Sequence, residues 1–280
     1  MADVVVTIKF VVPEDDPRAE PFDFATVLKT GRALQVAPFP VTVHDLRPRV
    51  DTDNAPLLDV EGFATQKVPC DGLNGMEGWE DAYSRWTAEW LCEYLGARKV
   101  VYYNYHPAVV AHVDGSQKVA FERCCQHLGL SEEEGRKSRM AVINLWRPLK
   151  GPVTDSPLAV CDARTARLED LEITTDVYGE GSFARPSSEV ACSAVLWLSS
   201  TDFPFSSRPS HLVVLQHRFW YLRDMMPDEL LLLRCFDSTK GPSEGGTTIH
   251  SAFFDEARSG KGWPLRESIE VRTCVLYSKR

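Results

Sequence analysis

The stretch "MAVINLWRPL" (residues 140–149) decides the fold, because it opens a long part of the chain built from short apolar segments. Its nearly continuous apolar run, followed by the turn-forming "KGPVTDS", is typical of a buried β-strand. Turn-forming residues separate six further segments of this kind: "PLAVCDA" (157–163), "SEVACSAVLWL" (188–198), "HLVVLQHRFWYL" (211–222), "ELLLLRCFDS" (229–238), "TTIHSAFFDE" (247–256) and "ESIEVRTCVLYS" (267–278). Many short strands with few long helices predict a mostly β sandwich or barrel with flanking helices.

The residues before this region add strands and two helices. A β-branched run at 4–12 and the segment 37–46 are expected to form strands. Residues 76–96 predict a helix, because their aromatic residues recur at helical spacing before Gly96, a natural C-terminal stop. A second helix is expected over 116–129, with Ser116 as its N-cap. Between the two helices, residues 98–114 are expected to form a strand, a turn and a second strand.

Composition limits the classes of function. The chain has 280 residues and a formal net charge of −9, without a basic block, which argues against wrapping nucleic acid. No apolar run reaches the roughly 18–20 residues of a membrane span, and the start lacks the pattern of a secretory signal. The eight cysteines include no CxxC pair, so we expect buried thiols in a reducing cytoplasm. We expect one domain over 1–280, with 1–95 as an N-terminal elaboration packed on the core.

A histidine and an aspartate in "VVAHVDGSQ" (109–117) form a candidate metal site. On a strand, His112 and Asp114 share a face because they are two residues apart. Two histidines and one carboxylate on one face are typical of non-haem Fe(II) sites that activate oxygen. His250, in a short β-like segment, is the preferred third ligand; His217 and His211 are the alternatives.

A possible carboxylate-binding pair follows His250 in the sequence. Arg266 and Ser268 stand two residues apart on an expected strand, so both side chains lie on one face. A guanidinium fork beside a hydroxyl suits a carboxylate held in a bidentate manner. Arg258 lies closer to His250 in sequence and is the alternative arginine.

Three long blocks carry a resemblance to a known family: "NLWRPLKGPVTDSPLAVCDARTA" (144–166), "HRFWYLRDMMPDELLLLRCFDS" (217–238) and "HSAFFDEARSGKGWPLRESIEVR" (250–272). Together with the order of HxD, histidine and RxS, they resemble the AsaB/CmcJ-like hydroxylase/desaturase family of secondary metabolism. This family belongs to the iron(II)/2-oxoglutarate-dependent oxygenases, and the fungal aziridine-forming oxygenase looks related. The resemblance covers roughly residues 95–280 well and the first 95 loosely.

The resemblance implies a double-stranded β-helix (jelly-roll) core and a set of site residues. By this resemblance His112, Asp114 and His250 would bind Fe(II). Arg266 and Ser268 would grip the distal carboxylate of 2-oxoglutarate, whose keto acid end would chelate the iron.

Further residues of the candidate pocket are expected from their neighbourhood. In "NLWRPL", Asn144 and Arg147 are candidates for co-substrate binding and Trp146 for substrate binding. The alternative places Trp146 in the core and Arg147 in a structural ion pair. Tyr103 and Tyr105, just before the HxD strand, are candidates for the substrate side or for a packed sheet face.

The expected activity is oxidation of an unactivated C–H bond of a small secondary metabolite or amino acid, with Fe(II), 2-oxoglutarate and O₂. Hydroxylation, desaturation and ring closure can share the same ligands, so the motifs do not select among them. One alternative is an S-adenosylmethionine-dependent methyltransferase, although "YGEGSFARP" (178–186) is not set between a strand and a helix. Others are a non-catalytic jelly-roll binding protein and a redox-neutral cupin-like metal enzyme.

Overall fold

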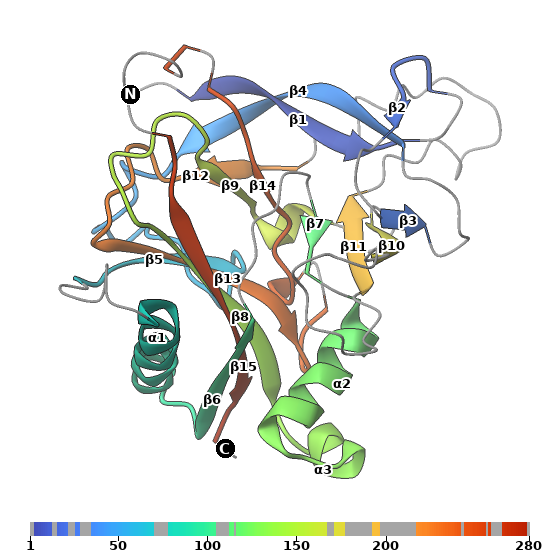
Figure 1. The fold of residues 1–280 in the computed structure, drawn as a ribbon, viewed down its shortest axis with the longest axis vertical. Coiled ribbons are helices and arrows are strands. Elements are labelled where there is room, and N and C mark those ends of the chain that lie inside the picture. The colour runs from blue at the N-terminus through green and yellow to red at the C-terminus, as the bar shows by residue number, and fades with distance from the viewer. Residues whose placement is uncertain are drawn as a thin grey trace.

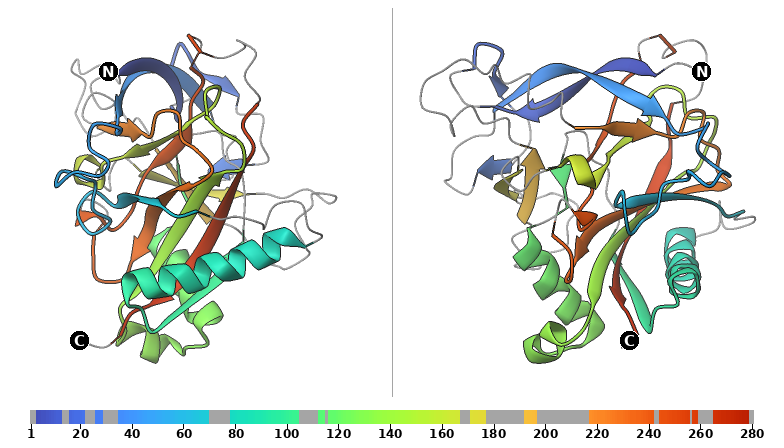
Figure 2. Two further views of the ribbon diagram at one scale, coloured as in Figure 1. Left: turned by 90° about the vertical axis from the view of Figure 1, so that its left-hand side faces the viewer. Right: turned by 180° about the vertical axis from the view of Figure 1, so that it is seen from behind.

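A computed structural model of residues 1–280 shows the fold (Figure 1). The structure describes residues 3–12, 16–21, 26–28, 35–69, 78–104, 112–114, 116–166, 171–176, 192–196, 217–241, 244–255, 257–258 and 265–278. Two β-sheets form most of the described fold, and the helices cover parts of their surface (Figures 1 and 2).

The larger sheet has the strand order β1-β4-β12-β9-β14-β7-β11-β10-β3, with β2 paired to β4. Its pairs are antiparallel except β4 with β12, which is parallel. The strands are β1 (Val4–Val11), β2 (Glu20–Pro21), β3 (Thr26–Leu28), β4 (Gln35–Asp45), β7 (His112–Val113), β9 (Leu158–Cys161), β10 (Leu171–Asp176), β11 (Cys192–Leu196), β12 (Phe219–Tyr221) and β14 (His250–Ala252). Strands from distant parts of the chain therefore meet at the centre of this sheet.

The smaller sheet is antiparallel throughout, in the order β5-β13-β8-β15-β6. Its strands are β5 (Phe63–Lys67), β6 (Lys99–Asn104), β8 (Met140–Pro148), β13 (Glu229–Asp237) and β15 (Ser268–Leu276). Strand β8, the segment that decides the fold, is buried along its whole length at the centre of this sheet.

Alternation along β8 divides its side chains between two cores. Val142 and Trp146 face the larger sheet and pack with its residues, including Leu158 and Val160. Ile143 and its neighbours on the same face pack instead on α1. Both faces of β8 are covered, which explains why its sequence is an almost unbroken apolar run.

Three α-helices and one 3-10 turn accompany the sheets in the described residues. Helix α1 (Trp79–Leu95) runs along the outer face of the smaller sheet (Figure 2) and ends at Gly96, whose φ of 58° lies in the left-handed region. Helix α2 (Gln117–Leu128) begins at Ser116, whose hydroxyl accepts a hydrogen bond from the Val119 amide. The others are α3 (Glu132–Arg136), which starts with a capping box, and η1 (Ala163–Thr165).

Most elements expected from the sequence are present. The opening strand, both long helices with their caps, and strands in each apolar segment after residue 140 are confirmed. Four short strands were not expected from the sequence: β2, β3, β5 and β10. Polar residues interrupt the apolar pattern in β5 ("FATQK") and β10 ("LEITTD"). It also extended the final strand to Arg266, whereas β15 begins at Ser268.

The first 95 residues contribute strands to both sheets: β4 lies beside β12, and β5 lies beside β13. The boundary of an N-terminal elaboration at residue 95 stays a prediction. Among the described residues, no helix is long and apolar enough to cross a membrane.

Candidate metal centre

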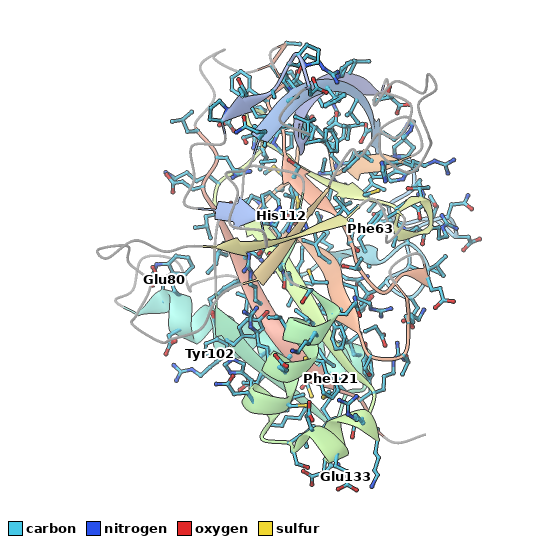
Figure 3. The ribbon with its side chains drawn as sticks, turned by 90° about the vertical axis from the view of Figure 1, so that its right-hand side faces the viewer. Phe63, Glu80, Tyr102, His112, Phe121 and Glu133 are labelled. Atoms are coloured by element: carbon cyan, nitrogen blue, oxygen red, sulfur yellow. The ribbon has the colours of Figure 1, made fainter. Side chains whose placement is uncertain are left out.

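His112, Asp114 and His250 lie together in the interior of the fold. Strands β7 and β14 are neighbours in the larger sheet, and His250 pairs directly with His112 across them. The two imidazole rings are 4.3 Å apart at their centroids. Figure 3 shows His112 among the strands, whereas Glu133 lies on α3 at the periphery. The sheet register thus joins two histidines that are far apart in sequence.

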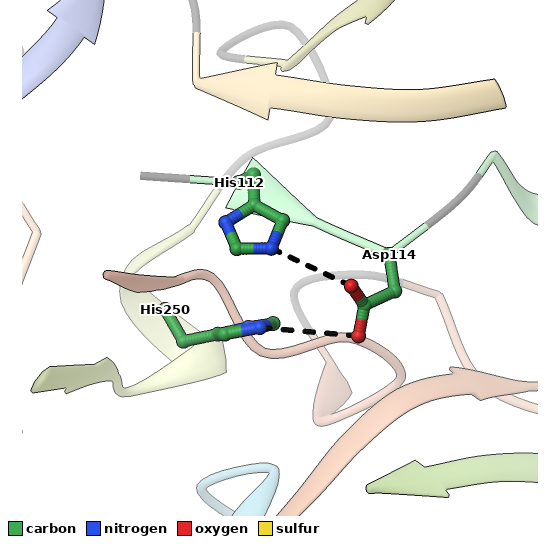
Figure 4. Close-up of side chains that lie close together, drawn as sticks. All are labelled: His112, Asp114 and His250. Carbon is green, nitrogen blue, oxygen red and sulfur yellow. Dashed lines mark ion pairs between the residues drawn. The ribbon is translucent and has the colours of Figure 1, made fainter. Parts of the chain in front are cut away.

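Asp114 completes the group from the bend that follows β7 (Figure 4). Its Oδ1 lies 3.4 Å from His112 Nε2, and its Oδ2 lies 3.9 Å from His250 Nε2. One ligand atom from each residue can be chosen so that all three lie within 4.8 Å of one another. Within the described ranges, these residues form the one group of His, Cys, Asp or Glu side chains with this spacing.

His250 presents a free lone pair to this group. Its Nδ1 lies 3.1 Å from the carbonyl oxygen of Thr248, which fits a proton on Nδ1. Its Nε2 is buried and makes no hydrogen bond with any described residue. Burial, and then the neighbouring His112, lower the pKa of His250 to about 4. The imidazole is therefore neutral at pH 7, as a metal ligand must be.

Asp114 is ionised although it is buried. Burial alone would raise its pKa, but Arg272, and after it the hydrogen bond with His112, hold the pKa well below its usual range. Arg272 Nη2 lies 2.7 Å from Asp114 Oδ1. The site therefore offers one anionic oxygen ligand and two imidazoles before any metal arrives.

Four residues surround Asp114. The sequence analysis gave Asn144 another role, as a co-substrate ligand, and did not include Cys235, Glu270 or Arg272 in the site. Asn144 Nδ2 donates to Asp114 Oδ2, and the Cys235 thiol lies 3.5 Å from the same oxygen. Burial raises the pKa of Cys235 well above its usual range, so it stays a thiol and can donate. Glu270 and Arg272 complete the surroundings from β15. The sequence does contain a pattern that indicates Glu270 and Arg272: these two charged residues alternate with apolar ones in "SIEVRTCVL".

The structure places Arg266 just before β15, beside Trp146. Its guanidinium lies 5.9 Å from the Trp146 ring centre, and Nη1 donates to the Ser156 carbonyl at 2.7 Å. Burial lowers the pKa of Arg266 below its ordinary value. Ser268 begins β15 opposite Pro148 of β8. The alternative arginine, Arg258, pairs with Asp224.

Arg147 requires a correction, because it does not face the candidate metal centre. It lies on the face of β8 opposite Asn144 and Trp146, where it donates to the carbonyls of Val68 and Pro227. Its guanidinium also lies over the α1 ring of Tyr83, 5.6 Å from the centroid. Arg147 thus fixes two loops and α1 to the sheet, and it is not in a position to bind a co-substrate at the centre.

The remaining candidates are divided between the core and the undescribed residues. Tyr103 stacks on His127 with ring centroids 5.0 Å apart, and burial raises its pKa. Trp146 is buried in the core between the sheets. Of the alternative histidines, His217 is buried just before β12 and is not part of the group. Tyr105 and His211 lie outside the described residues.

A family model described as an oxidoreductase/YMDC permease-like domain matches residues 8–192 and 201–276. The chain belongs to this oxidoreductase family. Among its relatives, the hydroxylase/desaturase efuI of Hormonema carpetanum is 35% identical over 175 residues, which cover 61% of this chain and 52% of that protein. The hydroxylase/desaturase asaB of Aspergillus flavus is 33% identical over 154 residues, covering 53% of this chain and 60% of asaB. The resemblance inferred from the sequence is confirmed.

Longer alignments connect this family member with iron-dependent dioxygenases. The Fe(II)/2-oxoglutarate-dependent dioxygenase nvfI of Aspergillus novofumigatus is 27% identical over 301 residues, covering 97% of this chain and 95% of nvfI. A solved structure of the iron and alpha-ketoglutarate-dependent endoperoxidase NvfI superposes with a TM-score of 0.75 at 24% identity, covering 99% of each chain. This likeness confirms the expected jelly-roll fold. The matches to the hydroxylase/desaturases span about half of those proteins.

The neutral state of His250 predicts a pH dependence of stability in the metal-free protein. Its folded-state pKa of about 4 lies below the ordinary value of 6.5, so the unfolded chain binds more protons between these values. The contribution to stability is complete above about pH 6.5 and is lost as the pH falls toward 4, by up to about 1.4 kcal/mol per pH unit. Urea unfolding from pH 7 to 4 should show this slope, and His250→Gln should reduce it. Equal slopes in both proteins would contradict the assignment.

The placement of Arg147 predicts a structural rather than a functional phenotype. Arg147→Met leaves the carbonyls of Val68 (buried) and Pro227 (partly buried) without this donor, so we expect a loss of about 2–4 kcal/mol in the free energy of unfolding. The folded variant should bind metal and 2-oxoglutarate with wild-type affinity. Urea unfolding and calorimetric titration check the two parts, and weakened 2-oxoglutarate binding at unchanged stability would overturn the correction.

Proposed function

We propose that this protein is an Fe(II)/2-oxoglutarate-dependent oxygenase that oxidises an unactivated C–H bond of a small secondary metabolite or amino acid. The observation that carries the proposal is the buried Nε2 of His250, which has no hydrogen-bond partner among the described residues and lies beside His112 and Asp114. A buried nitrogen lone pair without a donor is costly unless a ligand occupies it. A metal ion bound by these three residues would satisfy it.

The donor set fits a ferrous ion. Two imidazoles and one carboxylate leave coordination positions open, which is typical of non-haem Fe(II) oxygenases. The bound iron, with 2-oxoglutarate and O₂, would supply the oxidising power that no side chain offers. The names of relatives such as nvfI and the hydroxylase/desaturases support the same chemistry.

The chain itself would contribute orientation, charge and exclusion of water. Asp114 supplies the negative charge, while burial keeps His250 neutral. Arg266 is proposed to hold the distal carboxylate of 2-oxoglutarate with Ser268. Its guanidinium is partly buried and donates to the Ser156 carbonyl, an acceptor that an anionic ligand can replace. The buried ring of Trp146 beneath it provides an apolar wall.

The alternatives from the sequence are less well supported. A methyltransferase of the α/β class needs a sheet flanked by helices, whereas the described fold is mostly β. A binding protein without a metal would not need a complete and buried ligand set. The choice among hydroxylation, desaturation and ring closure stays open. A cytoplasmic location and a partner set without nucleic acid or membrane remain part of the proposal, on the basis of composition.

Binding of 2-oxoglutarate to the metal-loaded protein tests the proposed function. We expect calorimetry to show 2-oxoglutarate binding to protein loaded with Mn(II), a redox-stable substitute for Fe(II), and much weaker binding to the metal-free protein. Succinate, as a control with no keto group to chelate the metal, should bind more weakly than 2-oxoglutarate. Affinity for 2-oxoglutarate that does not depend on metal would contradict the proposal.

A further inference from the structure

Three side chains of the smaller sheet surround the carboxylate of Asp114. Arg272 Nη2 lies 2.7 Å from Oδ1, and Asn144 Nδ2 donates to Oδ2, so each oxygen has its own donor. Glu270 Oε1 accepts hydrogen bonds from both donors, from Arg272 Nε at 3.0 Å and from Asn144 Nδ2 at 3.2 Å. We call Asn144, Glu270 and Arg272 the Asp114 clamp.

The sheet register builds the clamp. Asn144 of β8 and Arg272 of β15 are direct partners across the ladder, so their side chains leave the sheet side by side on the same face. Glu270, two residues before Arg272, shares this face. Asn144 and Glu270 are buried, and the Arg272 side chain is only 13% exposed. Such a closed and buried polar ring is rigid, because each member is held by two others.

Asp114 needs an external constraint of this kind. It lies in the bend after a strand of only two residues, so no strand pairing fixes its backbone. The terminal torsion of an aspartate side chain is broad and permits rotation of the carboxylate. The clamp restrains this rotation from the opposite sheet.

We infer that Asn144, Glu270 and Arg272 are positioning residues that hold the Asp114 carboxylate in the orientation in which it binds the metal. The inference rests on the proposed function, because it assigns the clamp a role only if Asp114 is a metal ligand. Groups that hydrogen-bond to a metal ligand typically change metal affinity 10–100-fold when removed. The competing explanation is that the ring only stabilises the packing of β8 against β15.

Asn144 gives a cleaner test than Arg272. Removing Arg272 also removes a positive charge that repels a dication, so two opposite effects on metal affinity would be combined. Asn144 is neutral, so its replacement should change the orientation of the Asp114 carboxylate without changing the net charge of the site. Asn144→Leu removes the donor at similar size. Thr273→Val is a matched control, because it removes the buried hydrogen bond from Thr273 to the Ile143 carbonyl on the opposite face of the sheet.

The experiment is titration of the metal-free full-length protein with Co(II), followed by visible absorption, with thermal unfolding of the same samples. We expect Asn144→Leu to bind Co(II) about 10–100-fold more weakly than wild type and to show an altered Co(II) spectrum. Thr273→Val should lower the melting temperature but keep the wild-type affinity and spectrum. If Asn144→Leu does not fold, Asn144→Ser, a smaller polar replacement, should show the same weakening.

Two failures can be told apart. Wild-type affinity and spectrum in the folded Asn144 variant, with binding lost in Asp114→Ala, would overturn the clamp and leave the proposed function intact. No Co(II) binding by the wild type, or unchanged binding in Asp114→Ala, would overturn the proposed function and the clamp together.

Discussion

Replacement of Asp114 by alanine is expected to weaken Fe(II) binding by more than about 100-fold and to abolish turnover of 2-oxoglutarate. Removing a group that only hydrogen-bonds to a metal ligand typically costs 10–100-fold, and the loss of a direct ligand should exceed that range. Asp114 is also the anionic member of the proposed ligand set, so no charge would remain on a ligand to offset that of the ion. Equilibrium dialysis with Fe(II) under anaerobic conditions measures the affinity, and succinate release measures turnover.

The alanine variant also leaves Arg272 without one of its two carboxylate partners. Breaking a buried ion pair costs about 3–5 kcal/mol, so part of the effect could reflect unfolding. Asp114→Asn is the second variant, because its carbonyl oxygen can still accept from Arg272 while it is a much weaker metal ligand. His127→Ala is the control: His127 stacks on Tyr103 and is not part of the group. Retained Fe(II) affinity in folded Asp114→Asn would count against the ligand assignment.

Replacement of Arg266 by methionine is expected to raise the KM for 2-oxoglutarate while metal affinity stays the same. Truncating one partner of a buried, hydrogen-bonded charge pair costs about 2–5 kcal/mol, which corresponds to roughly 30- to 4000-fold in affinity. The guanidinium lies beside Trp146. Among the described residues, it makes no hydrogen bond with any of the three proposed metal ligands. Kinetics at varied 2-oxoglutarate and Co(II) titration separate the two effects.

Arg258→Met provides the matched comparison for this prediction. Arg258 pairs with Asp224, so its loss should affect local stability and leave the KM for 2-oxoglutarate near the wild-type value. The reverse outcome would assign the co-substrate role to Arg258. In that case the KM for 2-oxoglutarate would rise in the Arg258 variant and stay at the wild-type value in the Arg266 variant.

The proposed ligand set could be predicted from the sequence because its signal is local chemistry. An HxD pair at a strand end shares a face by the period of the strand, and only the third histidine required a long-range guess. The sequence favours His250 over His217 and His211, and the register of β14 against β7 places His250 beside His112. No local pattern encodes this register, so the sequence alone leaves all three histidines as candidates for the third ligand.

The placement of Arg147 and the omission of Arg272 have separate causes. Alternation separates Asn144 and Trp146 from Arg147, but it does not say which face is inside when both faces of a strand are buried, as in β8. At the start of β15, Arg266 and Ser268 match the expected carboxylate-binding pair, whereas Glu270 and Arg272 continue the same alternation deeper into the core. Charged residues inside an apolar strand are costly unless paired, and that cost was the available signal.

The most direct measurement for the central claim is the anaerobic visible absorption spectrum of the purified protein with Fe(II) and 2-oxoglutarate. If His112, Asp114 and His250 bind iron with open positions for the keto acid, a weak metal-to-ligand charge-transfer band should appear only when both components are present. A protein that gives no band with both components in excess, and that retains no iron on gel filtration, would contradict the claim.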